Sequence, residues 1–146
     1  MKKPIKGIAV DGETRGNPGP SKYQGVNIDT GEIVFNVSIG VATNNIAEFC
    51  ALGHGILECI KYGISTTIYT DSQTALYWIK NKKVNSNLTD NPKTKKAKDF
   101  VSRIEKALSE LNIEFDGVDL IVNNMIAVSK WYTSEWGEIP ADFGNK

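Results

Sequence analysis

The chain has 146 residues, no net formal charge and 23% charged residues, values that are typical of one soluble globular domain. No apolar run approaches the roughly 20 residues of a membrane-spanning helix, and the Met-Lys-Lys-Pro start lacks the apolar core of a signal peptide. We therefore expect a single domain over residues 1–146, a cytoplasmic monomer without membrane contact. A net charge of zero does not indicate a nucleic-acid partner.

The first part of the chain predicts three antiparallel strands, at residues 6–13, 21–29 and 32–40. Asp29-Thr30-Gly31-Glu32 joins the second and third strands, and Gly31 accepts the positive φ that a hairpin turn requires. Strands in immediate succession with short turns between them are typical of an antiparallel meander.

A helix is expected next, capped by Thr43 or Asn44 and ended by Tyr62-Gly63. Its apolar residues recur at spacings of three and four: Ile46, Phe49, Leu52, Ile56, Leu57 and Ile60. Cys50 and Cys59 lie nine positions apart on this helix, about 13 Å, which is too far for a disulfide. We expect two free thiols, and a packing or surface role for the single histidine, His54.

Two strand ends present carboxylates. Asp11 ends the first strand before a run rich in glycine and proline, and Asp71 ends a strand expected at residues 64–70. A right-handed strand-helix-strand crossover makes these strands parallel, and ligands collect beyond the carboxyl ends of such strands. We therefore expect Asp11 and Asp71 side by side. Glu48, at the margin of the helix's buried stripe, needs a partner or a metal ion.

The second half of the chain is less regular. We expect a short helix around Ala75–Ile79, a loop over 81–90, a helix that begins at Asn91-Pro92, and a last strand over 125–131. Residues 112–124 stay ambiguous, with a turn at Asp116-Gly117 and a possible short strand over 118–122. Trp131 and Trp136 are expected to pack in the core, whereas the role of Trp78 is open.

Lysines are concentrated in the middle of the chain. Between residues 80 and 98 the sequence has seven lysines and a single acid, Asp90. The lysines are Lys80, Lys82, Lys83, Lys93, Lys95, Lys96 and Lys98. This local excess predicts either a face that attracts polyanions or an ordinary solvated lysine face. The sequence favours neither.

Five motifs together resemble the catalytic domain of type 1 ribonuclease H. They are Asp-Gly-x-x-x-Gly-Asn-Pro-Gly at 11–19, Thr-Asn-Asn-x-x-Glu-Phe at 43–49, Tyr-Thr-Asp-Ser-Gln at 69–73, Trp-x-Thr-x-x-Trp-Gly-Glu-Ile at 131–139 and Ala-Asp-x-Gly at 141–144. The tail, Trp-Gly-Glu-Ile-Pro-Ala-Asp-Phe-Gly, is similar to that of a bacterial subgroup. The resemblance implies an α/β ribonuclease H-like fold: a mixed five-stranded sheet, three antiparallel strands then parallel ones, with helices on both faces.

The resemblance also implies a catalytic site. Asp11, Glu48, Asp71 and Asp142 match the four carboxylates that hold two Mg²⁺ ions, for which Mn²⁺ is an expected substitute. Such a site hydrolyses the RNA strand of RNA/DNA hybrids by a two-metal-ion mechanism. Glu138 matches a mobile acid that helps the product leave, although an ordinary loop glutamate is a close alternative. The alternative for the four acids is a set of separate surface salt bridges.

Substrate contacts carry over from the same motifs. The positions that match contacts to the RNA strand near its 2′-hydroxyls are Asn17, Asn44 and Gln73. The positions that match a pocket for a DNA-strand phosphate are Thr43, Asn45, Ser86 and Asn87. Thr133 is expected beside the scissile phosphate. Thr43 and Asn45 can serve as helix caps as well.

Two departures keep other functions open. Many family members have a histidine where this chain has Tyr132, and the separate hybrid-binding domain of the family is not found in these residues. Hybrid binding is therefore expected to be weak and salt-sensitive. The alternatives are a non-catalytic hybrid-binding or single-strand-binding module, and a nuclease of this fold that acts on DNA.

Overall fold

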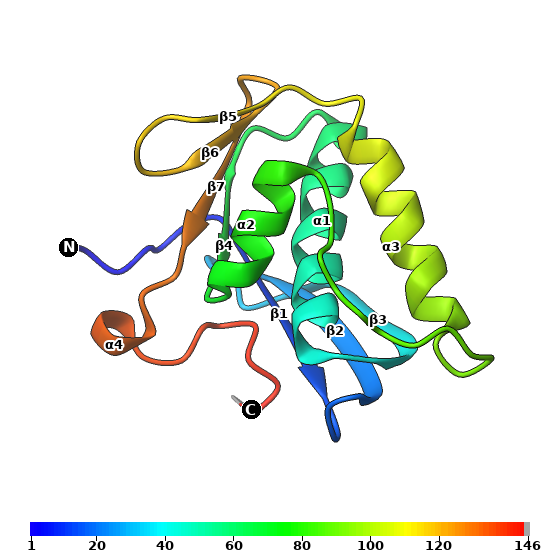
Figure 1. Cartoon of the computed structure of the whole chain (residues 1–146). Coiled ribbons are helices and arrows are strands. Elements are labelled where there is room, and N and C mark those ends of the chain that lie inside the picture. Colours follow the sequence, from blue (N-terminus) through cyan, green and yellow to red (C-terminus); the bar gives the residue numbers. More distant parts are fainter. Residues whose placement is uncertain (145–146) are drawn as a thin grey trace.

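The computed structural model describes residues 1–144, which form one seven-stranded sheet with four helices (Figure 1). In chain order the elements are β1 (Ile8–Thr14), β2 (Gly19–Asn27), β3 (Ile33–Ala42), α1 (Asn44–Tyr62), β4 (Thr67–Thr70), α2 (Gln73–Asn81), α3 (Lys95–Leu108), β5 (Ile113–Phe115), β6 (Leu120–Val122), β7 (Ile126–Lys130) and α4 (Thr133–Trp136). Within this part of the chain, none of the helices is both long and apolar enough to cross a membrane.

The sheet has the strand order β3-β2-β1-β4-β7-β6-β5. β1, β2 and β3 pair antiparallel, whereas β4 pairs parallel with both β1 and β7. The predicted mixed α/β sheet, with an antiparallel meander followed by parallel strands, is therefore confirmed. The crossover from β1 to β4 through α1 is what brings the carboxyl ends of these two strands together.

The expected count of five strands was two too low. The ambiguous segment 112–124 forms the hairpin β5–β6, which adds to the free edge of β7 in antiparallel order. Gly117 has a φ of 99° in its turn, and Asp116 Oδ1 accepts hydrogen bonds from the backbone N–H groups of Val118 and Asp119. The Asp-Gly turn was visible in the sequence, but the strands on either side have only three residues each, too few for a periodic signal.

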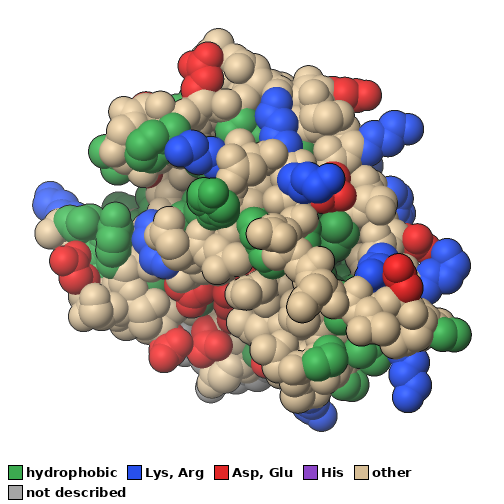
Figure 2. Space-filling model, in the orientation of Figure 1, with side chains coloured by type: hydrophobic (Ala, Val, Ile, Leu, Met, Phe, Trp, Pro, Cys, Tyr) green, Lys and Arg blue, Asp and Glu red, His purple; other side chains and the backbone are tan. Residues whose placement is uncertain are grey.

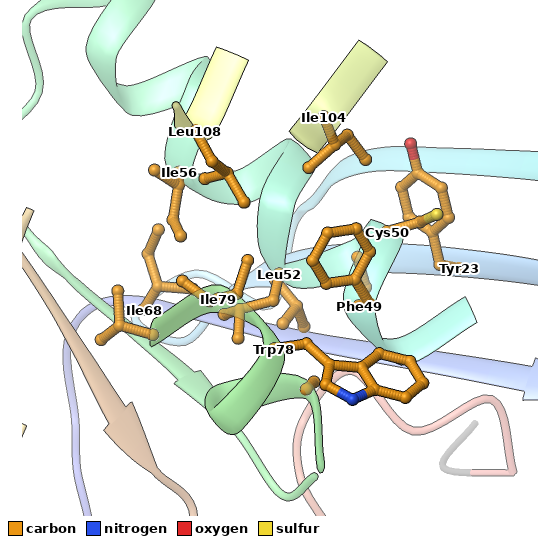
Figure 3. Packing of buried hydrophobic residues seen from close by; sticks show 14 of the residues in the cluster. Tyr23, Phe49, Cys50, Leu52, Ile56, Ile68, Trp78, Ile79, Ile104 and Leu108 are labelled. Atoms are coloured by element: carbon orange, nitrogen blue, oxygen red, sulfur yellow. The ribbon is translucent and has the colours of Figure 1, made fainter. Parts of the chain in front are cut away.

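Three helices cover one face of the sheet and form the main core with it (Figure 1). Phe49 and Leu52 of α1 lie next to Trp78 and Ile79 of α2 (Figure 3). Trp78 is 7% exposed, and its ring meets that of Phe49 edge to face with centroids 6.2 Å apart. The open question about Trp78 is thus answered by a packing role.

The other face of the sheet is covered by the tail, which includes the one-turn helix α4. Trp131 is fully buried there against Ala9 of β1 and Val26 of β2. Its indole Nε1–H donates to Gly137 O at 2.9 Å, and its ring lies 5.1 Å from that of Trp136. The packing roles expected for both tryptophans are confirmed, and the tail is fixed against the sheet.

Details of the helices follow the sequence with one exception. Thr43 Oγ1 caps α1 by accepting from Ile46 N, and Cys50 and Cys59 are buried free thiols, as predicted. α3, however, begins at Lys95 instead of at Asn91-Pro92. Asn91 Oδ1 accepts from the next backbone N–H groups and forms a separate turn, so the expected cap stands outside the helix.

Candidate active site

Three carboxylates from distant parts of the chain meet at the carboxyl end of the parallel strands. Asp11 of β1, Glu48 of α1 and Asp71 just after β4 each offer an oxygen, and these oxygens lie within 4.8 Å of one another. The parallel register pairs Ile8 with Ile68 and Ala9 with Tyr69, and continuing it by two residues brings Asp11 level with Asp71. The predicted meeting of Asp11 and Asp71 is confirmed, but Asp11 does not end its strand: it is the fourth of the seven residues of β1, which continues to Thr14.

Glu48 is held in the cluster by the backbone of β1. The N–H of Gly12 donates to Glu48 Oε1. A Cβ at residue 12 would lie 2.5 Å from the carbonyl carbon of Ala47, so only glycine lets α1 approach β1 this closely. Glu48 was expected at the margin of the buried stripe, but it is only 5% exposed. Gly12, the first of the glycines that the sequence suggested as a turn, therefore lets α1 pack closely against β1.

The cluster is electrostatically costly. Burial raises the pKa of Asp11 to about 7, and the charges of Asp71 and Asp142 add to this against the opposing hydrogen bond with Glu48. Burial, followed by the charges of Asp11 and Asp71, raises the pKa of Glu48 well above its usual value. Acidic side chains also gather in a hollow below α2 in Figure 2. Buried carboxylate oxygens that repel one another are a donor set that fits a hard divalent cation.

Asp142 lies beside this trio without joining the group of oxygens within 4.8 Å. It is partly exposed, and it is close enough for its charge to raise the pKa of Asp11. The residues on both sides of it, Ala141 and Phe143, are buried. The fourth predicted acid is thus brought to the edge of the site by a tail that is fixed on either side of it.

A hydrogen-bonded row across the sheet fixes the tail. Gln24 of β2 pairs with Asp11 of β1, and its Nε2 donates to the carbonyl oxygen of Ala141 at 2.7 Å. Asn36 Nδ2 of β3 donates in turn to Gln24 Oε1 at 3.1 Å. Gln24 is 6% exposed, and it was not among the site residues predicted from the sequence. The sequence does carry a signal for it: Lys22, Gln24 and Val26 are alternate residues of β2, so all three lie on the face of the sheet that the tail covers.

The positions that resemble RNA contacts flank the acids. Asn17 Oδ1 accepts from the backbone N–H of Asn44 at 3.1 Å, so the loop after β1 is tied to the start of α1. Gln73 is the exposed first residue of α2, two residues after Asp71. The structure therefore brings Asn17 and Asn44 into contact, with Gln73 next to the acid that ends β4.

The positions that resemble a DNA-phosphate pocket are spread over two segments. Thr43 and Asn45 lie at the start of α1, where Thr43 is also the cap. Ser86 lies in the segment between α2 and α3 and lines a cavity of about 240 Å³ together with Ile46 of the first turn of α1. Asn87 is exposed beside it. The structure thus brings Ser86 close to the helix start that carries the other two residues.

The two remaining expected residues belong to the tail. Thr133 begins α4 and Glu138 follows it in the tail, and both side chains are exposed. Neither belongs to the carboxylate group found within residues 1–144. Next to them, Lys130 Nζ donates to the backbone oxygen of Asp71 at 2.6 Å, which positions a positive charge at the end of β4.

The lysines between residues 80 and 98 do not share one environment. Lys98 pairs with Asp90 at 2.7 Å, and Lys95 pairs with Asp99 at 3.2 Å. Lys82 Nζ donates to Leu111 O at 2.6 Å. Several members of this group are therefore held by local partners, whereas Lys83 and Lys96 are exposed and form no ion pair among the described residues.

Fold and site together define a class of protein: an α/β domain with a carboxylate cluster at the carboxyl ends of its parallel strands, suited to divalent cations. Residues 5–119 match the family described as RNase H. The chain is 34% identical over 116 residues to ribonuclease H of Enterobacter sp. (strain 638), a match that covers 76% of this chain and 74% of that protein.

A second relative is also a ribonuclease H. Identity to ribonuclease HI of Streptomyces coelicolor is 32% over 114 residues, 73% of this chain, which spans about half of that longer protein (49%). RNase H1 of Halobacterium salinarum is a structural neighbour with a TM-score of 0.49 and 23% identity, covering 88% of this chain and 86% of the other. The chain belongs to the RNase H family, and the predicted enzyme class, ribonuclease H, is confirmed.

Proposed function

We propose that this enzyme hydrolyses the RNA strand of RNA/DNA hybrids with Asp11, Glu48, Asp71 and Asp142 as ligands of two Mg²⁺ ions. The observation that carries the proposal is the convergence of three carboxylate oxygens within 4.8 Å, two of them on buried residues whose pKa values are raised. Without cations the carboxylates repel one another, and bound divalent cations would offset this repulsion by taking the carboxylate oxygens as ligands.

Each residue has a distinct task in this proposal. Asp11 and Glu48 are held rigidly by β1 and by the N–H of Gly12, so they define the deeper part of the ion site. Asp71 and Asp142 are only partly buried, so they face the substrate side. When bound, two divalent ions would activate the attacking water and stabilise the leaving 3′ oxygen. Mn²⁺, which also takes oxygen ligands, is the expected substitute.

Substrate recognition is proposed for the residues around the acids. Asn17, Asn44 and Gln73 would contact the RNA strand near its 2′-hydroxyls, which distinguish RNA from DNA. A phosphate of the DNA strand would lie at the start of α1, where it would be bound by these residues: Thr43, Asn45, Ser86 and Asn87. The hydrogen bond between Asn17 and Asn44 supports this by joining the loop after β1 to the start of α1, the helix that carries Glu48.

The tail is proposed to work as it does in the bacterial subgroup that it resembles. Thr133 would lie beside the scissile phosphate, and exposed Glu138 would help the product leave. The fixed backbone on either side of Asp142 supports a positioned fourth ligand. We also propose that the chain forms one catalytic domain and acts as a cytoplasmic monomer. Gel filtration can test whether its size in solution is that of a monomer.

A cleavage assay tests the function directly. The wild type should cut a hybrid with a labelled RNA strand in Mg²⁺ or Mn²⁺, and should leave double-stranded RNA and double-stranded DNA intact. Asp71→Asn should reduce the rate by at least about 100-fold, because even residues that only support metal ligands contribute 10- to 100-fold. Asp29→Asn, the same change on an exposed turn residue, is the control. A wild type inactive in both metals, or an active Asp71→Asn, would overturn the proposal.

A further inference from the structure

A second hollow begins beside the acids and runs between α2, the β5–β6 hairpin and β7. It has a volume of about 330 Å³, and we call it the hairpin groove. The residues of its wall that matter here are Gln73, Tyr77, Lys80, Phe115, Lys130 and Tyr132. The hairpin that forms one side is the segment 112–124, which none of the ribonuclease H motifs explains.

Four exposed apolar side chains line the hairpin groove. Tyr77 is 60% exposed, Phe115 54%, Val118 78% and Tyr132 38%. Figure 2 shows hydrophobic side chains over α2 and the hairpin, directly above the acidic hollow. Three of these four residues are aromatic, and aromatic rings left open beside an active site are a sign of a binding surface. Their flat faces suit stacking by nucleic-acid bases.

The charges in the groove are positive. Lys80 Nζ lies 4.8 Å from the ring centroid of Phe115, and Lys130 Nζ bonds a backbone oxygen. Among residues 1–144 neither lysine forms an ion pair with a carboxylate, so no acidic side chain neutralises either charge. The acid at the hairpin tip, Asp116, is engaged by the backbone N–H groups of its own turn.

The groove is continuous with the proposed substrate path. Gln73, one of the proposed RNA contacts, belongs to its wall, and it lies two residues after Asp71. Lys130, also in the wall of the groove, donates from its Nζ to the backbone oxygen of Asp71. An RNA strand that leaves the acids past Gln73 therefore enters the hairpin groove, whose lining residues include no acid.

We propose that the hairpin groove binds single-stranded RNA that continues from the RNA strand of the hybrid. Bases would stack on Tyr77, Phe115 and Tyr132, and phosphates would lie near Lys80 and Lys130. This inference rests on the proposed hybrid cleavage and adds a substrate class to it: hybrids whose RNA strand extends beyond the duplex.

The test compares hybrids that differ only in an overhang of about six nucleotides. An RNA overhang of one polarity should lower KM at least about fivefold relative to a blunt hybrid, since one stacked base contributes about that much affinity. The double variant Tyr77→Ala/Phe115→Ala should lose this gain, and should keep kcat and KM on the blunt hybrid within about twofold. Both side chains are exposed, so the fold should tolerate their removal.

A matched control lies at the far end of α1. Lys61 Nζ lies 5.2 Å from the ring centroid of Tyr62, which is 61% exposed, so the pair repeats the chemistry of Lys80 and Phe115 away from the groove. Lys61→Gln/Tyr62→Ala should keep the overhang effect, whereas Lys80→Gln/Phe115→Ala should remove it. RNA overhangs without effect at either end, an equal gain from DNA overhangs, or an equal loss in the control would each overturn the proposal.

Binding can be measured without catalysis. A fluorescein-labelled hexaribonucleotide in EDTA should raise its anisotropy with the wild type and bind at least about fivefold more weakly to Tyr77→Ala/Phe115→Ala. This readout separates the two proposals, because a protein that fails to cut hybrids can still bind the oligonucleotide. Equal binding by wild type and variant would refute the groove even if hybrid cleavage is found.

Discussion

Replacing Asp11 by Asn should stabilise the metal-free protein while it abolishes cleavage. In the folded chain the pKa of Asp11 rises from 3.8 to about 7, mainly through burial. Between pH 4 and 7 the unfolded chain therefore loses this proton while the folded chain keeps it, so the free energy of unfolding falls as the pH rises. Asparagine carries no charge, so the Asp11→Asn variant does not lose this part of the free energy of unfolding. In the wild type the loss is complete above pH 7.

The size of the effect follows from the same two pKa values. About three pKa units correspond to about 4 kcal/mol at pH 8, an upper value because the site can relax, and to a rise in Tm on the order of 10 °C. Thermal unfolding in EDTA at pH 4 and pH 8 measures it: Asp11→Asn and wild type should match at pH 4 and diverge at pH 8. Asp29→Asn, an exposed acid, should show no divergence.

Saturating Mg²⁺ should invert this order. The ions bind the folded wild type and stabilise it, whereas Asp11→Asn loses a ligand and gains little. A variant that is less stable than wild type in EDTA at pH 8 would refute the reasoning, since Asp11 would then be stabilised by partners instead of strained by burial. Equal differences at pH 4 and pH 8 would show that packing and not ionisation is responsible.

Three further changes test separate parts of the structure. Gln24→Leu removes the bond to the Ala141 carbonyl, so the Mg²⁺ concentration for half-maximal cleavage should rise about tenfold, with KM for the hybrid unchanged; an unchanged metal titration would exclude this role. Gly12→Ala should lower the free energy of unfolding by about 1–3 kcal/mol in denaturant titrations, because its Cβ meets the α1 backbone. Lys83→Glu/Lys96→Glu should raise KM and flatten its salt dependence, with kcat retained; an unchanged KM would show that these lysines are idle.

The parts of the fold that the sequence predicted are those with a local signal. The meander, the stripe of α1 and the strand-end acids all depend on periodicity or turn residues within a few positions of one another. Asp11 and Asp71 could be placed together because the crossover rule fixes where parallel strands end. The hairpin β5–β6 could not, because three-residue strands gain their stability from pairing with β7 and leave no periodic pattern of their own.

The fourth acid shows why a motif alone does not define this site. The family match ends at residue 119, so Asp142 lies outside it, and its position depends on contacts between residues more than 100 positions apart. Gln24 can hold Ala141 only because β2 pairs with β1 in the register that sets Gln24 opposite Asp11. Gln24, which anchors the tail, and Asp11, beside which the tail places Asp142, are thus neighbours on the sheet. Any shift of the tail along the sheet would break the Gln24 bond and move Asp142 away from Asp11 together, so metal affinity and tail order should be lost in the same variants.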